Sequence, residues 1–197
     1  MNHILQTTEI GAVIKNRRTV KPEKMNGKKI PDDLVFQMLD SANWAPTHGR
    51  TEPWRFIVFS NDKTVEFTRR HAELYKLNTD PSAFLENKYK SLAAQGENAS
   101  HIIVAWMKRV PNHKIPEIEE ICATAAAIEN ILLTATSLGI ASFWSTGGIT
   151  HHRALREEFN LGQEDMILGL LYLGYADEPF REGIRMIPLS EKIEWRK

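Results

Sequence analysis

Apolar residues recur along the chain in two kinds of pattern, separated by polar, glycine or proline residues. A spacing of three to four residues places apolar side chains on one face of a helix, whereas a short continuous apolar run is typical of a buried strand. The helical spacing predicts helices over 3–16, 31–45, 63–76, 82–96, 117–138 and 151–159. The short apolar runs predict strands over 54–59, 101–107, 140–144 and 167–175. This order of elements predicts an α+β fold.

The longest predicted helix, 117–138, is apolar on nearly all of its sides. Between Ile121 and Leu138 only Glu129 and Asn130 are strongly polar. The stretch approaches the length of a membrane span, but two such residues in its middle argue against that interpretation. A helix of this kind is buried at the centre of a domain or at a subunit interface, and we expect the subunit interface.

The composition is that of an ordinary globular protein and argues against one class of partner. The chain has 197 residues, of which 42% are hydrophobic and 25% charged, and we expect a single domain over residues 1–197. Lysine plus arginine and aspartate plus glutamate both number 25, so the formal net charge is zero. A general nucleic-acid binder needs a basic excess to displace counterions, so we expect no nucleic-acid partner.

Cys122 is the only cysteine in the chain. It cannot form an intramolecular disulfide, and this usage is typical of reducing compartments. Because Cys122 lies in an apolar stretch, we expect it to be buried and unreactive. Residues 1–18 lack the basic start, apolar run and cleavage site of a signal peptide, so we predict a cytoplasmic protein.

Asn16-Arg17-Arg18-Thr19 is the first segment with candidate chemistry. Arginine presents a rigid fork of N–H donors that matches phosphate oxygens, and the threonine hydroxyl adds another donor. The alternative is that both arginines are solvated cations at a helix C-terminus, where the helix dipole favours them. Taken alone, the segment fits this alternative better.

A polar loop from Ala45 to Glu52 runs directly into the apolar strand that begins at Trp54. Loops held by a rigid scaffold are usual places for binding groups. Together with the two arginines, this loop favours a flat, phosphorylated cofactor over a metal ion or a nucleophile. The adjacent pair His151-His152 is a poor chelate, and the sequence has no HExxH, GxSxG, P-loop or GxGxxG pattern. We therefore expect no metal site and no catalytic side chain.

Several features occur in an order that is typical of one known family. They are Arg17-Arg18-Thr19, Ala45-Pro46 through Pro53-Trp54-Arg55-Phe56, the long helix, Leu138-Gly139-Ile140 leading into Trp144-Ser145-Thr146-Gly147, and Leu171-Tyr172-Leu173-Gly174-Tyr175. By these features the chain resembles the FMN-dependent nitroreductase family, in particular its small single-domain members. Each feature alone is weak, but the ordered set spans the chain from end to end.

The resemblance implies a nitroreductase-like fold, a mixed and mostly antiparallel sheet flanked by helices, with the long central helix at a dimer interface. It also implies a homodimer with FMN at two sites built from both subunits. The residues that it assigns to FMN are Arg17, Arg18 and Thr19 at the phosphate and ribityl end, Thr47, His48 and Arg50 in a loop often supplied by the partner subunit, Trp144, Ser145 and Thr146 beside the isoalloxazine ring, and Arg185 or Arg181 over the phosphate.

Each of these segments also has a plainer interpretation. The loop could be only a polar connection, Trp144 a core side chain, the Ser145–Gly148 segment a strand-ending turn, and Arg185 a surface residue. The functional interpretation is preferred because all of the segments occur together in the family order.

The function implied by the resemblance is hydride transfer from NAD(P)H through bound FMN to nitroaromatic, quinone or similar acceptors by a ping-pong mechanism. Thr19 stands where the family usually has serine, and Glu52 stands where glutamine is commoner. The Thr47–Arg50 segment also differs from the Ser- and Asn-rich version of the family.

Two alternatives stay open: a protein that stores or delivers FMN without turnover, and a relative with dehalogenase or desaturase chemistry. The region around 75–100 is expected to shape the acceptor pocket.

Overall fold

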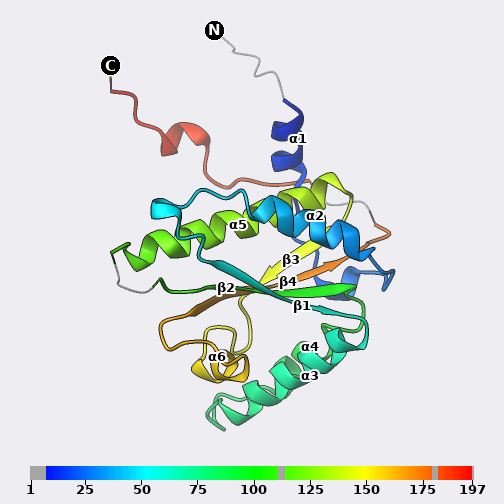
Figure 1. The fold of residues 1–197 in the computed structure, drawn as a ribbon. Helices are drawn as coiled ribbons and strands as arrows, with labels where there is room; N and C mark the ends of the chain where they lie inside the picture. Colours follow the sequence, from blue (N-terminus) through cyan, green and yellow to red (C-terminus); the bar gives the residue numbers. More distant parts are fainter. Residues whose placement is uncertain (1–7, 111–113, 179–181, 197) are drawn as a thin grey trace.

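A four-stranded sheet forms the centre of the computed structural model, which describes residues 8–110, 114–178 and 182–196 (Figure 1). The strands are β1 (Trp54–Ser60), β2 (His101–Met107), β3 (Ala141–Ser145) and β4 (Met166–Gly174), in the order β1-β2-β4-β3. All three strand pairs are antiparallel. One isolated parallel bridge, between Thr19 and Ser142, adds a short segment of the N-terminal chain beside β3.

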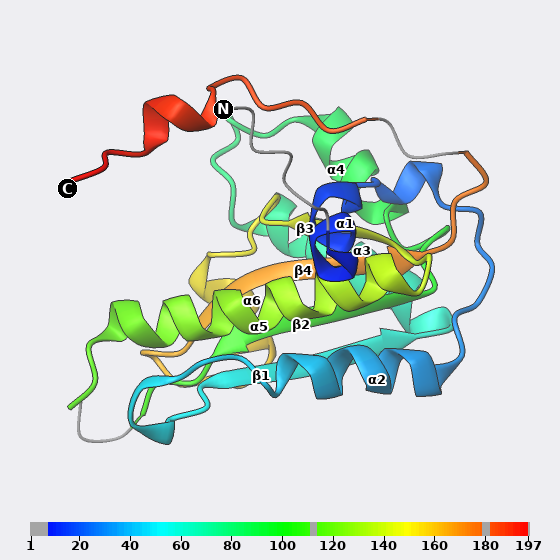
Figure 2. The same ribbon diagram turned by 90° about the horizontal axis from the view of Figure 1, so that it is seen from above.

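Helices cover both faces of the sheet (Figures 1 and 2). On one face lie α1 (Glu9–Asn16), α2 (Asp32–Ala42) and α5 (Glu117–Ser137), and on the other lie α3 (Asp62–Leu77), α4 (Glu86–Ala94) and α6 (Arg153–Glu158). Short 3-10 turns are η1 (Pro22–Lys24), η2 (His48–Arg50) and η3 (Leu189–Lys192). Among the described residues, no helix combines the length and the apolar character that crossing a membrane would require.

The central strands β2 and β4 are buried along almost their whole length because helices cover both sides of them. A strand that is covered on both faces is apolar throughout instead of alternating, and these two segments show that pattern. The core is correspondingly divided in two by the sheet, with one cluster against α2 and α5 and a second against α3, α4 and α6.

The elements predicted from the sequence are confirmed where the structure describes them. Strand β2 has the predicted bounds, and the bounds of the other strands differ from the predicted ones by one residue. Helix α1 begins at Glu9 and not at residue 3 as predicted, because Thr8 is extended and caps the helix; residues 1–7 lie outside the described part of the chain. Its first turn is capped by the Thr8 hydroxyl, which accepts a hydrogen bond from the Gly11 N–H at 3.1 Å.

Helix α4 is shorter than the predicted 82–96 and begins only at Glu86. A local turn replaces the first predicted helical turn, because the Asp80 carboxylate accepts hydrogen bonds from the Ser82 N–H and hydroxyl at 2.8 and 2.5 Å. The Leu85 N–H donates to the Tyr75 hydroxyl at 3.1 Å and not to a carbonyl oxygen one helical turn earlier.

The expectation that Cys122 is buried is wrong, because this cysteine is exposed in the described chain. Neighbouring positions of α5 such as Ala123, Ala127 and Ile131 face the core and are at most 5% exposed. Cys122 lies on the side of the helix that turns away from the sheet. The apolar stretch therefore did not indicate the direction of this side chain, and the expected place of the helix at a subunit interface stays a prediction.

Gly169 in β4 makes room for the indole ring of Trp144 in β3. A Cβ atom at Gly169 would lie 2.0 Å from the Trp144 Nε1 atom. The same Nε1–H donates a hydrogen bond to the Leu168 carbonyl oxygen at 3.0 Å. The absence of a side chain at position 169 therefore determines where Trp144 lies.

We predict that Gly169→Ala destabilises the protein by about 1–3 kcal/mol, because the indole must leave its place and its hydrogen bond. The measurement is the free energy of unfolding in urea. Gly147→Ala is the control, since a Cβ there would meet its nearest atom, the Ser145 hydroxyl oxygen, at an ordinary 3.5 Å. Equal stabilities of the Gly169→Ala variant and the wild type would contradict the packing described here.

Candidate functional site

Strand β3 ends in a tight turn that carries three of the predicted site residues. Trp144 and Ser145 are its last strand residues, and Thr146 opens the turn. The Ser145 hydroxyl accepts a hydrogen bond from the Gly147 N–H at 3.2 Å. Gly148 adopts a φ of +67°, a conformation that glycine reaches without strain. The Ser145 hydroxyl thus stabilises the turn, and the positive φ at position 148 favours glycine there.

A large cavity of about 790 Å³ opens between this turn and helix α4. Its lining comes from three parts of the chain: Lys21 and Glu23 near η1, Phe143 through Gly148 at the end of β3, and Lys88, Ser91, Leu92, Ala94, Gln95, Glu97 and Asn98 on and after α4. The volume is within the range of small-molecule and cofactor sites. Part of the region around 75–100 thus forms one wall of this cavity, and its role at the acceptor stays a prediction.

A second cavity of about 370 Å³ adjoins the first, because Trp144 and Thr146 line both. Arg17 and Thr19 lie on its wall, together with Glu129 and Leu132 of α5 and Ser142 of β3. The chain after α1 is held in this place by the Val20 N–H, which donates to the Ser142 carbonyl oxygen at 2.9 Å. The structure therefore brings Arg17 and Thr19 beside Trp144 and Thr146, as the predicted site requires.

The two neighbouring arginines differ in their contacts. The Arg17 guanidinium forms an ion pair with Glu129, with Nε 3.5 Å from the carboxylate oxygen, and both side chains are partly exposed. The Arg18 guanidinium donates hydrogen bonds to the carbonyl oxygens of Lys15 and Arg17 at 2.6 and 2.7 Å. Arg18 thus donates to carbonyl groups at the C-terminal end of α1, as a cation at a helix C-terminus would. It does not line either of the two cavities.

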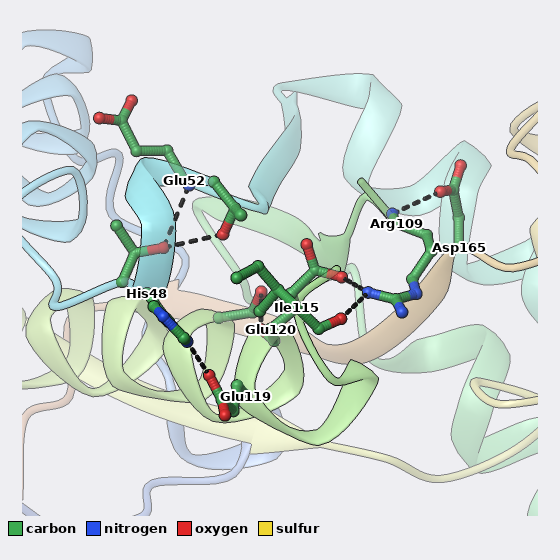
Figure 3. A network of polar contacts seen from close by, with 10 residues as sticks. His48, Glu52, Arg109, Ile115, Glu119, Glu120 and Asp165 are labelled. Carbon is green, nitrogen blue, oxygen red and sulfur yellow. Dashed lines mark hydrogen bonds and ion pairs between the residues drawn. The ribbon is translucent and has the colours of Figure 1, made fainter. Parts of the chain in front are cut away.

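The loop that carries Thr47, His48 and Arg50 lies at the other end of α5 (Figure 3). The His48 Nδ1 atom is 2.5 Å from the Glu119 carboxylate. Glu119 precedes Glu129 by ten residues, which is about 15 Å along a helix. Within one chain, the loop residues therefore do not join Arg17 and Thr19.

This loop is held in a strained conformation. Besides Gly49, the non-glycine residues Arg50 and Glu52 have positive φ values of +56° and +42°. Such values are unfavourable for residues with a side chain and persist only where surrounding contacts hold them. Here the Thr47 hydroxyl contacts the Thr51 hydroxyl at 2.9 Å and accepts the Glu52 N–H at 3.2 Å. Strain of this kind is common at functional sites.

A buried ion pair fixes the start of α5 beneath the loop (Figure 3). The Arg109 guanidinium donates to the Glu120 carboxylate and to the Ile115 carbonyl oxygen, and the Arg109 backbone N–H donates to Asp165 at 3.0 Å. The side chains of Arg109 and Glu120 are 8% and 0% exposed. Removing one partner of such a pair leaves a buried charge, so the pair fixes the position of this end of α5.

Two residues that the sequence analysis did not single out lie at the site. Lys21 lines the large cavity two residues after Thr19, a spacing that keeps side chains on one side of an extended segment and could have indicated it. His71 of α3 lies behind the Gly148 turn and is 1% exposed. Burial, together with the nearby charge of Lys88, lowers the pKa of His71 to about 4, so the ring is neutral at physiological pH.

The last predicted site residue, Arg185, is exposed, and its guanidinium donates to the Ile184 carbonyl oxygen at 3.1 Å. It lines neither cavity. Its alternative, Arg181, lies outside the described residues. Within the described part of the chain, no three His, Cys, Asp or Glu side chains gather as metal ligands would.

Comparisons with known proteins agree on one family. A model of the nitroreductase family matches residues 14–175. One relative is the Bacillus subtilis protein named "Putative NAD(P)H nitroreductase YfhC". It is 24% identical to this chain over 175 residues, which are 89% of this chain and 88% of that protein. The crystal structure of a nitroreductase-like family protein from Bacillus cereus is 28% identical, with a TM-score of 0.82 and 98% of each chain covered. A nitroreductase with bound FMN from Bacteroides fragilis is 24% identical, with a TM-score of 0.69 over 97% of this chain and 100% of that one.

Proposed function

The chain belongs to the nitroreductase family, and on this premise we propose that it is an FMN-dependent oxidoreductase that uses NAD(P)H as its electron donor. In the proposed reaction, hydride passes from NAD(P)H to nitroaromatic, quinone or similar acceptors in two separate half-reactions, at a cytoplasmic site. The observation that carries the proposal is the pair of adjoining cavities, with Arg17 and Thr19 in one and Lys21 in the other. When bound, FMN would supply the redox chemistry, and the residues of the chain would bind and orient it.

The smaller cavity fits the phosphate end of the cofactor. The guanidinium of Arg17 and the hydroxyl of Thr19 are donors of the type that phosphate oxygens accept, and both lie on its wall. Arg17 would have to exchange Glu129 for the phosphate. The Arg17 and Glu129 side chains are 26% and 45% exposed, and partly exposed ion pairs are weak, so the exchange costs little. Arg18 would contribute positive charge from the adjacent end of α1.

The larger cavity fits the ring end of the cofactor. Trp144, Ser145 and Thr146 would lie beside the ring, and Lys21 would place a positive charge in the same cavity. Reduction puts negative charge on the pyrimidine edge of a flavin, and preorganised cations or N–H groups stabilise such charge. NAD(P)H and the acceptor would bind in turn in this cavity, beside the wall formed by α4.

We further propose that the protein is a homodimer and that each FMN site is completed by the partner subunit. Thr47, His48 and Arg50 lie away from Arg17 within one chain, so a second copy would have to supply this loop. The C-terminal segment extends away from the body of the chain (Figures 1 and 2). Its exposed apolar side chains, suited to contact with a second copy, are Ile184, Met186, Ile187, Leu189, Ile193 and Trp195. Arg185 in this segment could then approach the phosphate.

The visible spectrum tests the proposed function. We expect purified protein, or protein incubated with FMN and freed of excess, to be yellow with about one FMN per chain. Rapid anaerobic mixing with NADH or NADPH is expected to bleach this colour. Protein that stays colourless in excess FMN would contradict the proposal, whereas bound flavin that neither donor reduces would favour the storage alternative.

Arg17→Ala should weaken FMN binding by about 1.5–3 kcal/mol, roughly tenfold to 150-fold in Kd, which is the scale of a hydrogen bond to a charged group. Isothermal titration with FMN gives the affinity. Arg70→Ala is the matched control, because it removes another Arg–Glu pair, with Glu158 at 2.7 Å, that lines neither cavity. Unchanged affinity in a folded Arg17→Ala protein would exclude the assigned phosphate contact.

Light scattering after size exclusion should give a mass of twice the 22.5 kDa chain at micromolar concentration. The double variant Ile184→Asp/Met186→Asp should weaken the dimer, because charge in an apolar contact is unfavourable. Leu77→Asp is the control, since Leu77 is a similarly exposed apolar residue of α3, at 70% against 77% for Ile184. A monomeric wild-type protein would contradict the shared site.

A further inference from the structure

His71 reaches from α3 to the turn that follows β3, which borders the large cavity. Its Nε2 atom accepts a hydrogen bond from the Ile149 N–H at 3.3 Å. Its ring lies directly behind Gly148, where a Cβ atom would be 2.7 Å from the ring carbon Cε1. The ring is also nearly parallel to that of Phe67, with the centroids 6.0 Å apart. His71 is therefore packed against the turn and is not simply near it.

The hydrogen bond determines which nitrogen of the ring carries the proton. A backbone N–H can only donate, so Nε2 must be the unprotonated nitrogen and Nδ1 must carry the hydrogen of the neutral ring. Nδ1 is buried and has no hydrogen-bond partner among the described residues. Burial opposes a second proton on this ring and lowers its pKa, and the nearby charge of Lys88, which lines the large cavity, acts in the same direction. His71 is thus a permanent acceptor for the turn at neutral pH.

The N–H groups of the turn have different partners. The Gly147 N–H donates to the Ser145 hydroxyl, and the Ile149 N–H donates to His71. The Thr150 N–H donates to the Gly147 carbonyl oxygen at 3.3 Å. The Gly148 N–H has no acceptor among the described residues, and Gly148 belongs to the wall of the large cavity. The Thr146 N–H, at the start of the turn, likewise has no acceptor among the described residues. The Gly148 N–H is therefore one of two backbone donors of the turn without a partner in the described part of the chain.

We propose that His71 is a positioning residue of the flavin site: by accepting the Ile149 N–H and filling the space behind Gly148, it holds the free Gly148 N–H in the cavity wall. This inference rests on the proposed function, because it assigns the donor to the negative charge of reduced FMN. A preorganised N–H favours the charged form over the neutral one. His71 would thus raise the affinity for reduced FMN relative to oxidised FMN without touching the cofactor.

A purely structural role for His71 makes a different prediction. If the ring served only to fill space in the core, an apolar residue of similar size would replace it, and the affinities for both redox forms would change together. If the acceptor matters, His71→Leu loses the effect, while His71→Gln keeps it because the Gln carbonyl oxygen can take the place of Nε2. His101→Gln is the matched control, since His101 is also buried, at 3% exposed, and lines neither cavity.

The experiment measures two quantities in the wild type and these three variants. The first is the hydrogen-exchange rate of the Ile149 amide without FMN, and the second is the ratio of the Kd values for reduced and oxidised FMN. We expect His71→Leu to raise both by about tenfold, the scale of one hydrogen bond. We expect His71→Gln and His101→Gln to stay within about threefold of the wild type on the same scale. If His71→Leu does not fold, His71→Asn takes its place, because its shorter amide does not reach Ile149.

The outcomes separate this inference from the proposed function. An unchanged Kd ratio in a folded His71→Leu or His71→Asn protein that binds FMN would overturn the inference and leave the proposed function intact. An unchanged exchange rate at Ile149 would also overturn the inference, with or without flavin. A wild-type protein that binds no FMN would overturn both. Faster exchange together with a higher Kd ratio, restored by His71→Gln, would support the positioning role.

Discussion

The bridge between Thr19 and Ser142 is the contact on which the candidate site depends. It joins the segment after α1 to the edge strand β3, far away in the sequence, through the 2.9 Å hydrogen bond from the Val20 N–H. Because side chains alternate along extended segments, this one pairing brings Arg17, Thr19 and Lys21 alongside β3, on the same side of their segment. Without it, the cationic groups and the Trp144 segment would not line adjoining cavities.

The fold could be predicted to a large extent because its signals are local. Apolar spacing defined the central strands and the long helix α5, since burial on both faces requires continuous apolar runs. The start of α4 could not be predicted, because a side-chain turn at Asp80 and the distant Tyr75 hydroxyl replace its first turn. The exposure of Cys122 also escaped the sequence, since an apolar stretch does not show which side of a helix faces the core.

The site could be predicted only in part, because its geometry depends on tertiary contacts. The family resemblance indicated Arg17, Thr19, Trp144 and Thr146, which lie together, but it did not indicate His71, whose role depends on packing between α3 and the turn at Gly148. The Thr47–Glu52 loop is strained and fixed to α5 by His48 and Glu119, away from the two cavities that Arg17, Thr19 and Lys21 line in its own chain. A preorganised loop at that position is what a site shared between two copies would require.

A crystal structure of the protein grown with FMN tests the central claim most directly. The account predicts flavin density that passes from Arg17 and Thr19, across Trp144 and Thr146, into the cavity bounded by Lys21 and Gly148. It also predicts that the partner's copy of the Thr47–Arg50 loop lies against the same flavin. Density elsewhere on the molecule, or empty cavities at saturating FMN, would contradict the account.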